Sequence, residues 1–372
     1  MRVLIATVTA GAGHLQAAVA LEEAWRDLRP KDQIQRLDVL DFTPRVYRKV
    51  YIDSYVKLIE HAPELWAHIF KKTDNPELAR KLTRVRQGFV KMVAARFIKQ
   101  LKKFKPDVVL CTHYMPLEIL GSVKKEQTVT PPLEVSIVTD FEAHALWMDA
   151  GVDLYCVAAE ETKARLVARG VPTDRVVVTG IPISRRFSGP IDAAEVRKRL
   201  GLRDDLPVLL VLGGGFGMGP VVEILTELNK VSQPLQIVVV CGRNQELRRE
   251  VAVLDHRHPT DVFGFVSNMH ELLAVSNLVL TKPGGLTTSE ALALGKPLFV
   301  LNPIPGQEAA NSDFLLEHGA AVKANRVEDL PFRIEKLLGS SRLSELASAA
   351  AALGKPRAAL DVCSAVLDRT GK

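Results

Sequence analysis

The feature that most constrains the fold is a strand, a glycine-rich turn and a helix, which occur in this order twice along the chain. The first copy spans residues 2–28, with Gly11 and Gly13 in its turn, and the second spans residues 207–231, with five glycines in the turn 213–219. Glycine lets a ligand approach the backbone closely, and the helix N-terminus behind it attracts anions. Each copy therefore predicts the beginning of a doubly wound α/β sheet.

Short apolar segments follow each copy, and most of them lack the alternation of a half-exposed strand. Such runs are typical of parallel strands that are buried on both faces. Helical segments separate them, so we predict two doubly wound α/β halves that join near residues 181–206. A final helix is expected over 357–369. The further strands are expected at 107–112, 134–139, 154–158, 175–179, 236–241, 277–280 and 297–301.

Length and composition limit the class of protein. A chain of 372 residues that is 47% hydrophobic and 25% charged fits a soluble protein of two domains. Its four cysteines lie far apart, without metal-binding spacing or a disulfide framework, which indicates a reducing compartment. We expect no signal peptide, because residues 1–6 already resemble a strand. We expect no membrane span either, because the longest stretch without charge, 206–222, contains five glycines and two prolines.

Residues 42–106, which we call the basic insert, depart from this alternation. They contain 16 Lys and Arg against 5 Asp and Glu, whereas the net charge of the whole chain is +6, so the remainder is acidic. Helices are expected over 45–61, 64–72 and 77–104. The apolar face of the last helix either packs on the sheet or, with the lysines, forms a surface for anionic lipid or nucleic acid. That face comprises Phe89, Met92, Val93, Phe97, Leu101 and Phe104, and the lysines elsewhere are Lys91, Lys99, Lys102 and Lys103.

The segment 281–311 combines an anion site with side chains that can bind hydroxyl groups. A glycine pair precedes a helix that begins with hydroxyl residues, and a loop with an adjacent amide and carboxylate follows. Phosphate and hydroxyl binding together suggest a nucleotide-sugar. The alternative for Thr287 to Glu290 is a capping box that only completes the helix end. The residues concerned are Gly284, Gly285, Thr287, Thr288, Ser289, Glu290, Gln307 and Glu308.

His14 follows the first glycine turn, at the N-terminus of the expected helix. The positive end of the helix dipole disfavours the imidazolium, so the neutral ring can accept a proton from an attacking hydroxyl. The alternative is a histidine that only caps its helix. Asp140, His144 and Trp147 follow the strand expected at 134–139. Asp140 can orient a hydroxyl or an imidazole, or it can cap a helix.

The donor-side segment 281–311 resembles that of family 28 glycosyltransferases, and Gly11-Ala12-Gly13-His14 resembles the family's N-terminal glycine–histidine signature. Ala12 stands at the middle position of this signature. Three further runs resemble the branch that glycosylates diacylglycerol, namely the monogalactosyldiacylglycerol synthases and the processive diacylglycerol glucosyltransferases. These runs are 138–147, 157–161 and 178–183. The resemblance covers nearly the whole chain and is strongest at 1–25, 134–183 and 207–318.

The resemblance implies the GT-B architecture, with two Rossmann-like doubly wound domains facing a cleft. Residues 1–182 would form an N-terminal acceptor domain that contains the basic insert, and residues 183–355 would form a UDP-sugar-binding domain. Residues 356–372 would form a C-terminal helix that packs back on the N-terminal domain. The implied reaction is a direct, inverting transfer of galactose or glucose from a UDP-sugar to diacylglycerol, with no cofactor and no metal.

The resemblance also implies roles for the candidate residues. His14 and Asp140 would be catalytic, and Gly13, His144 and Trp147 would contact the acceptor. Glu290 would accept hydrogen bonds from both ribose hydroxyls, the hydroxyl side chains beside it would hold the diphosphate, and backbone groups near Phe265 would pair with uracil. The other residues expected at the donor are Gly214, Gly215, Phe216, Gly217, Arg243, Val266, Gly285, Thr287, Thr288, Ser289, Gln307 and Glu308.

The expected partners are a UDP-hexose, a diacylglycerol-type lipid and, through the basic insert, an anionic membrane surface, but no nucleic acid. The implied location is the cytoplasm, peripheral on the inner face of the cell membrane. One alternative is a family member with another lipid-linked acceptor, such as the N-acetylglucosaminyltransferase of a peptidoglycan precursor. The run 140–147 and the basic insert argue against it. The other is a non-catalytic lipid- or nucleic-acid-binding protein on the same fold, which the presence of His14 and Glu290 disfavours.

Overall fold

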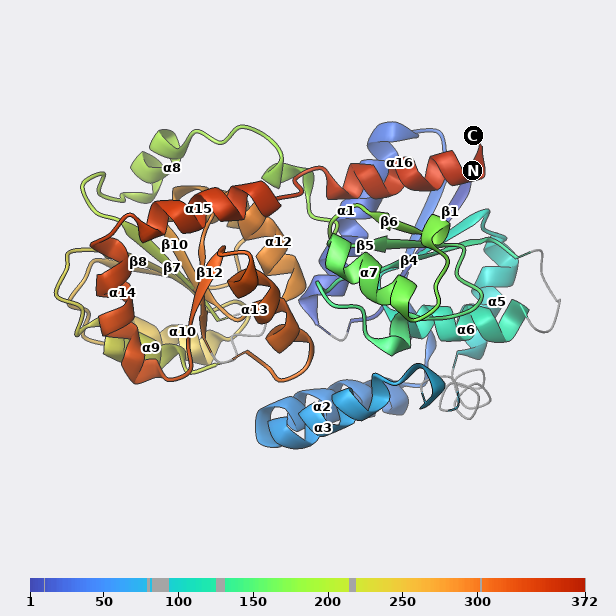
Figure 1. Cartoon of the computed structure of the whole chain (residues 1–372), viewed down its shortest axis with the longest axis horizontal. Helices are drawn as coiled ribbons and strands as arrows, with labels where there is room; N and C mark the ends of the chain where they lie inside the picture. Colours follow the sequence, from blue (N-terminus) through green and yellow to red (C-terminus); the bar gives the residue numbers. More distant parts are fainter. Residues whose placement is uncertain are drawn as a thin grey trace. The chain divides into compact units, whose positions relative to one another are not determined.

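The computed structural model describes residues 1–9, 11–78, 81, 94–124, 131–213, 219–301 and 303–371. Their contacts divide the chain into two compact units. The first unit comprises Met1–Arg185, Ile304–Ala310 and Arg357–Lys372, and the second comprises Arg186–Pro303 and Asn311–Pro356. Each unit contains one parallel sheet of six strands with helices around it (Figure 1).

The first sheet has the strand order β2-β1-β3-β4-β5-β6, and its pairings are all parallel. The strands are β1 (Arg2–Thr7), β2 (Gln33–Asp38), β3 (Val108–Cys111), β4 (Leu133–Ile137), β5 (Leu154–Val157) and β6 (Val176–Val178). The α-helices described in this unit are α1 (Ala12–Leu28), α2 (Arg45–His61), α3 (Pro63–Thr73), α5 (Ala95–Phe104), α6 (Tyr114–Lys124), α7 (Glu160–Ala168) and α16 (Ala358–Thr370).

The central strands of this sheet are apolar throughout because both faces are covered. In β1, Val3 and Ile5 pack on one face with α1 and α16, whereas Leu4 and Ala6 pack on the other with α5 and α6. Successive side chains of a strand point to opposite faces, so only a continuous apolar run fills both. On the first face α16 lies along α1 (Figure 1), and the thiol of Cys363 lies 3.9 Å from the carbonyl oxygen of Leu21.

The second sheet has the strand order β12-β11-β10-β7-β8-β9, again with parallel pairings. Its strands are β7 (Val208–Leu212), β8 (Gln236–Val240), β9 (Thr260–Phe263), β10 (Leu278–Thr281), β11 (Leu298–Leu301) and β12 (Ala321–Ala324). Its helices are α8 (Ala193–Leu200), α9 (Val221–Leu228), α10 (Gln245–Ala252), α11 (Met269–Val275), α12 (Gly285–Ala293), α14 (Leu330–Leu338) and α15 (Arg342–Leu353), and α13 (Gln307–Glu317) begins in the segment assigned to the first unit. The predicted pair of doubly wound α/β halves is confirmed.

Two strands were not predicted, and both lie at an edge of their sheet. These are β2 in the first sheet and β12 in the second. An edge strand is paired on one side only and is more exposed, so its sequence needs no continuous apolar run. The residues of β2 are Gln-Ile-Gln-Arg-Leu-Asp, and none of them is fully buried.

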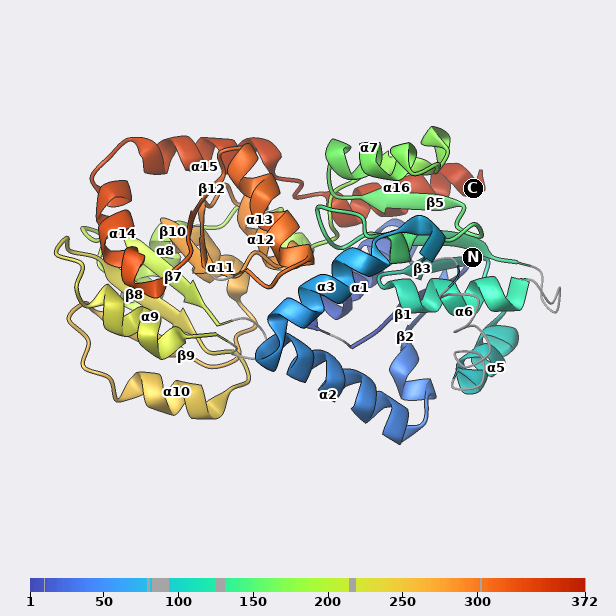
Figure 2. The same cartoon turned by 60° about the horizontal axis from the view of Figure 1, so that its bottom comes forward.

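The basic insert forms helices, with one difference from the expectation. Helices α2 and α3 meet at Ala62 and diverge from there (Figure 2), and they match the expected 45–61 and 64–72. The continuous helix expected over 77–104 is wrong, because Ala94 is a turn residue just before α5. Phe97 and Leu101 are buried in the core of the first unit and Phe104 packs against them, so this part of the apolar face packs on the sheet. Phe89, Lys91, Met92 and Val93 lie outside the described residues.

Among the helices of the described ranges, none combines the length and the hydropathy that crossing a bilayer requires.

Candidate active site

His14 lies where the chain changes direction in the first sheet. Strand β1 lies between β2 and β3, so the connections leaving β1 and β3 run to opposite sides, and ligands of such sheets bind at this position. His14 is in the first turn of α1, the next helix after β1, and Thr112 directly follows β3. The Nδ1 atom of His14 lies 2.8 Å from the Thr112 carbonyl oxygen and 2.9 Å from Oγ1 of Thr139.

These contacts fix the chemistry of the His14 ring. A carbonyl oxygen only accepts hydrogen bonds, so Nδ1 carries the proton and donates it, and Nε2 keeps its lone pair. The pKa of His14 is lowered to about 4 because burial disfavours the charged ring, which outweighs the opposing hydrogen bond to Thr112. The ring is therefore neutral near pH 7, with Nε2 unprotonated, and its side chain is partly exposed.

Aromatic rings surround His14. The ring of His113 lies edge-on at 4.8 Å between centroids, and the ring of Trp147 lies at 6.4 Å. Tyr114 stacks on His113 at 4.2 Å and meets Trp147 edge-on at 6.4 Å. The hydroxyl of Tyr51, in α2, lies 3.4 Å from that of Tyr114. This aromatic cluster restricts the side-chain rotation of its members, because buried rings pack at native density.

Sequence reasoning missed Thr112 and His113. They directly follow β3, as His14 follows β1, and the carboxyl ends of parallel neighbours meet at one edge of a sheet. The expected strand 107–112 thus already pointed to Thr112 and His113, which stand at its end. Selecting these two residues required knowing which strand pairs with β1.

The other residues predicted for the first unit lie near this edge. Gly13 precedes His14 in α1, and Asp140 follows Thr139 and is partly exposed. Trp147 is 4% exposed and belongs to a 3₁₀ turn, η2 (Ala145–Trp147). His144 is buried and faces α3, with Nε2 at 2.9 Å from the carbonyl oxygen of Phe70. These contacts do not test the catalytic and acceptor-binding roles expected for the four residues.

In the second unit the equivalent edge lies between β7 and β10. The turn 213–219 follows β7, and residues 282–284 follow β10. Gly214, Gly215, Phe216 and Gly217 lie outside the described residues. Gly219 has φ of +120°, and a Cβ atom there would lie 3.5 Å from Cε of Lys282. The two loops therefore approach each other at the position where a doubly wound sheet binds its ligand.

The helix α12 begins at Gly285, two residues before the expected capping box. Its N-cap is Gly284, with no side-chain cap, so the capping-box alternative for Thr287 and Glu290 is wrong. Ser289 instead donates a hydrogen bond of 2.9 Å to the Gly285 carbonyl. Thr287 is partly exposed, whereas Thr288 is fully buried and its hydroxyl has no partner among the described residues.

Glu290 is half-buried in the second turn of this helix. Burial raises its pKa to about 8, because no compensating charge or donor is found in the described part of the chain. A carboxylate in such surroundings is stabilised by any ligand that donates hydrogen bonds to it. Its properties suit a hydroxyl-rich ligand at the N-terminus of α12, where the helix dipole also favours an anion.

The remaining predicted donor residues lie at strand or helix ends. The guanidinium of Arg243, after β8, lies 5.0 Å from the ring centroid of Phe265, which follows β9 and is 59% exposed, and Val266 is next in the chain. Gln307 and Glu308 are the first two residues of α13, and Oε2 of Glu308 accepts a 2.8 Å hydrogen bond from the backbone N–H of Ile304. An exposed phenylalanine beside a guanidinium offers a stacking surface for a planar ring.

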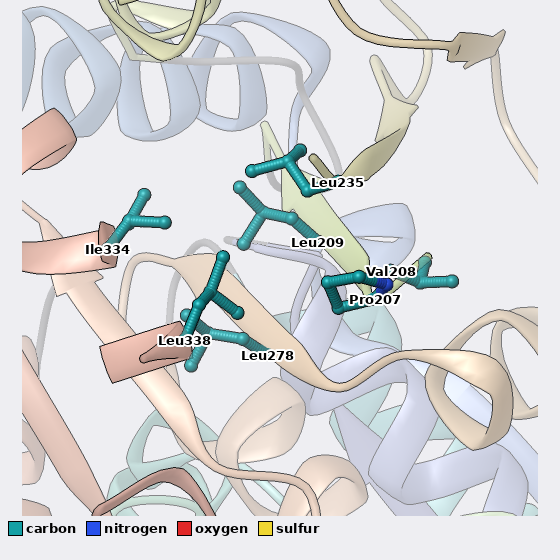
Figure 3. A pocket seen from close by; sticks show the side chains of 7 residues that line it. All are labelled: Pro207, Val208, Leu209, Leu235, Leu278, Ile334 and Leu338. Carbon is teal, nitrogen blue, oxygen red and sulfur yellow. The ribbon is translucent and has the colours of Figure 1, made fainter. Parts of the chain in front are cut away.

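A small apolar pocket in the second unit lies away from this edge. Figure 3 shows its lining, which includes Val208 and Leu278, the first residues of β7 and β10, and Leu235, just before β8. It therefore lies at the amino ends of the strands. Ligands of doubly wound sheets bind at the carboxyl ends, so we assign this pocket to core packing.

Comparisons with known proteins agree with the division of the chain into two units. Residues 14–183 match the model of the family described as monogalactosyldiacylglycerol (MGDG) synthase, and residues 208–360 match the family 28 glycosyltransferase C-terminal domain. The chain is 31% identical over 373 residues to the processive diacylglycerol beta-glucosyltransferase of Bacillus cereus strain AH187, covering 98% of this chain and 93% of that protein. It is 30% identical to the enzyme of the same description in Bacillus pumilus strain SAFR-032, covering 91% of this chain and 86% of that protein.

Solved structures share the fold at lower identity. MurG of Acinetobacter baumannii is similar with a TM-score of 0.65 and 18% identity, over 99% of each chain. The calicheamicin glycosyltransferase CalG4 is similar with a TM-score of 0.61 and 15% identity, over all of this chain and 99% of that one. This likeness establishes the glycosyltransferase GT-B fold alone. The family is shown by the two family models and by the identity to curated relatives over nearly the whole length. The chain belongs to the diacylglycerol-glycosylating branch of family 28 glycosyltransferases.

Proposed function

We propose that this protein transfers a hexose, glucose or galactose, from a UDP-sugar to diacylglycerol, with inversion at the anomeric carbon. The observation that carries the proposal is His14, a neutral histidine whose Nδ1 proton is held by the Thr112 carbonyl and whose Nε2 keeps its lone pair. The curated relatives that are 30–31% identical are described as processive diacylglycerol beta-glucosyltransferases, which supports the lipid acceptor.

In this reaction the Nε2 atom of His14 accepts the proton of the acceptor hydroxyl. The hydroxyl oxygen forms a bond with the anomeric carbon while the bond from that carbon to the diphosphate oxygen breaks, and UDP leaves with the electron pair. Holding Nδ1–H on a backbone carbonyl fixes the tautomer and the direction of the lone pair. Asp140, Gly13, His144 and Trp147 are proposed to shape the acceptor side.

The second unit is proposed to hold the UDP-sugar. Glu290 accepts hydrogen bonds from the ribose hydroxyls, and the hydroxyls of Thr287 and Thr288 with the N-terminus of α12 hold the diphosphate. These groups stabilise the charge that develops on the leaving group, so no metal or cofactor is required by the proposal. Phe265 and Arg243 flank the uracil, and Gln307 and Glu308 contact the hexose.

The lipid acceptor requires contact with a membrane, and we propose that the basic insert makes it. Lys71, Lys72, Lys99, Lys102 and Lys103 are exposed on α3 and α5. A well-placed Lys or Arg contributes about 1 kcal/mol at an anionic surface. The proposed location is therefore peripheral, on the cytoplasmic face of the cell membrane.

The proposal is tested by incubating the protein with UDP-glucose or UDP-galactose and with vesicles that contain diacylglycerol, followed by mass spectrometry of the lipids. A hexosyl-diacylglycerol from one sugar, and none with the His14→Ala variant, is the expected result. The choice of sugar and the addition of a second hexose are read from the same spectra. Failure of both sugars to give a glycolipid, while UDP still binds, would refute the lipid acceptor and leave the donor site intact.

A further inference from the structure

Helix α3 is attached to the rest of the first unit with little burial. No residue of α3 is fully buried, although the helix has eleven residues. A helix of this length is marginal in isolation and takes its stability from tertiary contacts. Polar and aromatic contacts at particular points must therefore hold α3 in place.

The strongest of these contacts is at Asp74, the residue at which α3 ends. Its carboxylate accepts hydrogen bonds of 2.7 Å and 2.8 Å from Nη1 and Nη2 of Arg169, one of 2.7 Å from Arg165, and one of 2.8 Å from the backbone N–H of Ala145. Arg165 also pairs with Glu142 at 2.5 Å. We call these groups, Asp74, Arg165 and Arg169 with Glu142, the Asp74 cluster.

Asp74 stays ionised at physiological pH. Burial opposes ionisation of Asp74, but hydrogen bonds from Arg169 and the Ala145 N–H lower its pKa to about 2. The bidentate contact of a guanidinium with a carboxylate also fixes the relative orientation of the two side chains, which a single hydrogen bond does not. The end of α3 is thus held both to α7, which ends at Ala168, and to η2.

His144 holds the same end of α3 through further contacts. Its Nδ1 accepts a hydrogen bond from the backbone N–H of Leu146, so Nε2 carries the proton and donates it to the Phe70 carbonyl at 2.9 Å. The rings of His144 and Phe70 lie 4.3 Å apart. Burial lowers the pKa of His144, against the hydrogen bond to Phe70 and the charge of Asp74, so the ring is neutral.

Two attachments of the helical pair lead to His14. The turn η2, to which Asp74 binds through Ala145, also carries Trp147, whose ring lies 6.4 Å from that of His14. At the other attachment, the hydroxyl of Tyr51 in α2 meets that of Tyr114, which stacks on His113 beside His14. The position of α2–α3 is therefore tied to the groups around the base.

We propose that Asp74, Arg165 and Arg169 are positioning residues for the lipid acceptor. They touch no reacting atom. They hold α2–α3, which belongs to the basic insert, in a fixed position relative to the sheet edge that carries His14. A lipid bound along these helices then presents its hydroxyl to Nε2 of His14. The inference rests on the proposed function, because it assigns the lipid acceptor to this part of the first unit.

The proposal makes two activities of the protein respond differently. Transfer to the lipid requires the helical pair in place, whereas slow hydrolysis of the UDP-sugar requires only the donor site and a water molecule. Asp74→Asn removes the charge but keeps the size, so it should lower kcat/KM for diacylglycerol by on the order of 10²-fold, the usual effect of a misplaced reactant. Hydrolysis and the Kd for UDP should change less than about twofold.

The experiment compares Asp74→Asn and Arg165→Gln with Asp27→Asn, a matched control that breaks an exposed Asp–Arg pair of the same unit at Arg185. Arg165→Gln is the milder variant, since Arg169 remains on Asp74. Each is assayed for lipid transfer, UDP-sugar hydrolysis and hydrogen exchange. We expect faster exchange in α2–α3, no change in α1, and a higher KM for lipid. Asp74→Glu should restore part of the lipid kcat/KM.

Several results would overturn the inference. An equal fall of hydrolysis and lipid transfer in Arg165→Gln would show that the cluster only supports the fold. An unchanged KM for lipid in both variants, with the wild type active, would show that the helical pair does not place the acceptor. A wild type that makes no glycolipid would refute the proposed function itself, which is a different failure from the first two.

Discussion

At the scale of single residues, His14 is the group on which turnover should depend most. Its neutral ring and fixed tautomer prepare it to accept a proton, and removing a general base typically lowers the rate by about 10²–10⁴-fold. We predict this fall in kcat for His14→Ala, with the Kd for UDP unchanged because the donor is bound by the second unit. Steady-state kinetics and calorimetry measure the two quantities. Near-normal turnover would move the base elsewhere, with Asp140 as the next candidate.

Glu290 should make UDP binding dependent on pH. Its pKa is raised to about 8 in the free protein, and hydrogen bonds from the ribose favour its ionised form. UDP binding should therefore release protons at a pH somewhat below about 8, and affinity should rise with pH toward about 8 and then level off. Calorimetry in buffers of different ionisation enthalpy counts the protons. Glu290→Gln should abolish the release and weaken binding by roughly 1.5–3 kcal/mol; unchanged affinity would remove Glu290 from the site.

The same carboxyl should affect stability with a defined sign. A pKa raised from 4.5 in the unfolded chain to about 8 in the folded one favours folding only while the group is protonated. This contribution is fully present below about pH 4.5 and is lost as pH rises toward about 8. Glu290→Gln should therefore raise Tm relative to the wild type at about pH 9 more than at about pH 4, as thermal unfolding by circular dichroism would measure. An equal Tm difference between Glu290→Gln and the wild type at both pH values would contradict the raised pKa of Glu290.

The candidate site residues that the sequence pointed to and those that it did not point to differ in one physical respect. His14 and the α12 hydroxyls follow glycine turns, so local pattern was enough to select them. His113 reaches His14 only through the pairing of β1 with β3, and His144 reaches Phe70 only because α3 folds back. Those contacts join positions about a hundred and about seventy residues apart, and no local pattern encodes them.

At the scale of elements, α5 should contribute charge but no apolar insertion to membrane binding. Lys99, Lys102 and Lys103 are exposed, whereas Phe97 and Leu101 are buried in the core of the first unit. Replacing the three lysines by glutamine should weaken binding to anionic vesicles at low salt, and added salt should reduce wild-type binding, since screening acts over about 8–10 Å at physiological ionic strength. Vesicle sedimentation measures both.

The matched control replaces three exposed lysines of the second unit, Lys198, Lys230 and Lys336, by glutamine. It changes the net charge by the same amount and should leave vesicle binding almost unaltered. Equal loss in the two triple variants would mean that net charge alone, and no surface of the basic insert, drives the binding.

Elements were predicted best where both faces are buried. The central strands β1, β3, β7 and β10 have continuous apolar sequences, and their ends were placed to within a few residues. The edge strands β2 and β12 were missed, because a strand paired on one side tolerates polar residues. In the basic insert the predicted helix was too long, because the amphipathic periodicity over 77–104 gave no indication of the turn at Ala94.

At the scale of the whole molecule, the last helix belongs to the first unit although it follows the second in sequence. Val362 and Val366 of α16 are fully buried against Ala18, Leu21 and Trp25. A carboxylate at Val362 would lie in this apolar core without a partner, at a cost of several kcal/mol. Val362→Asp should therefore strongly lower the Tm of the first unit and abolish sugar transfer.

The control for this variant lies two residues further along the same helix. Ser364 is exposed, so Ser364→Asp introduces the same carboxylate with a change in stability within about 0.5 kcal/mol. UDP affinity should survive in both variants, because the UDP site is proposed for the second unit, which has its own core. A Tm for Val362→Asp equal to that of Ser364→Asp would mean that α16 is not part of the first core. Loss of UDP binding in Val362→Asp alone would mean that the two units fold as one cooperative body, despite their separate sheets.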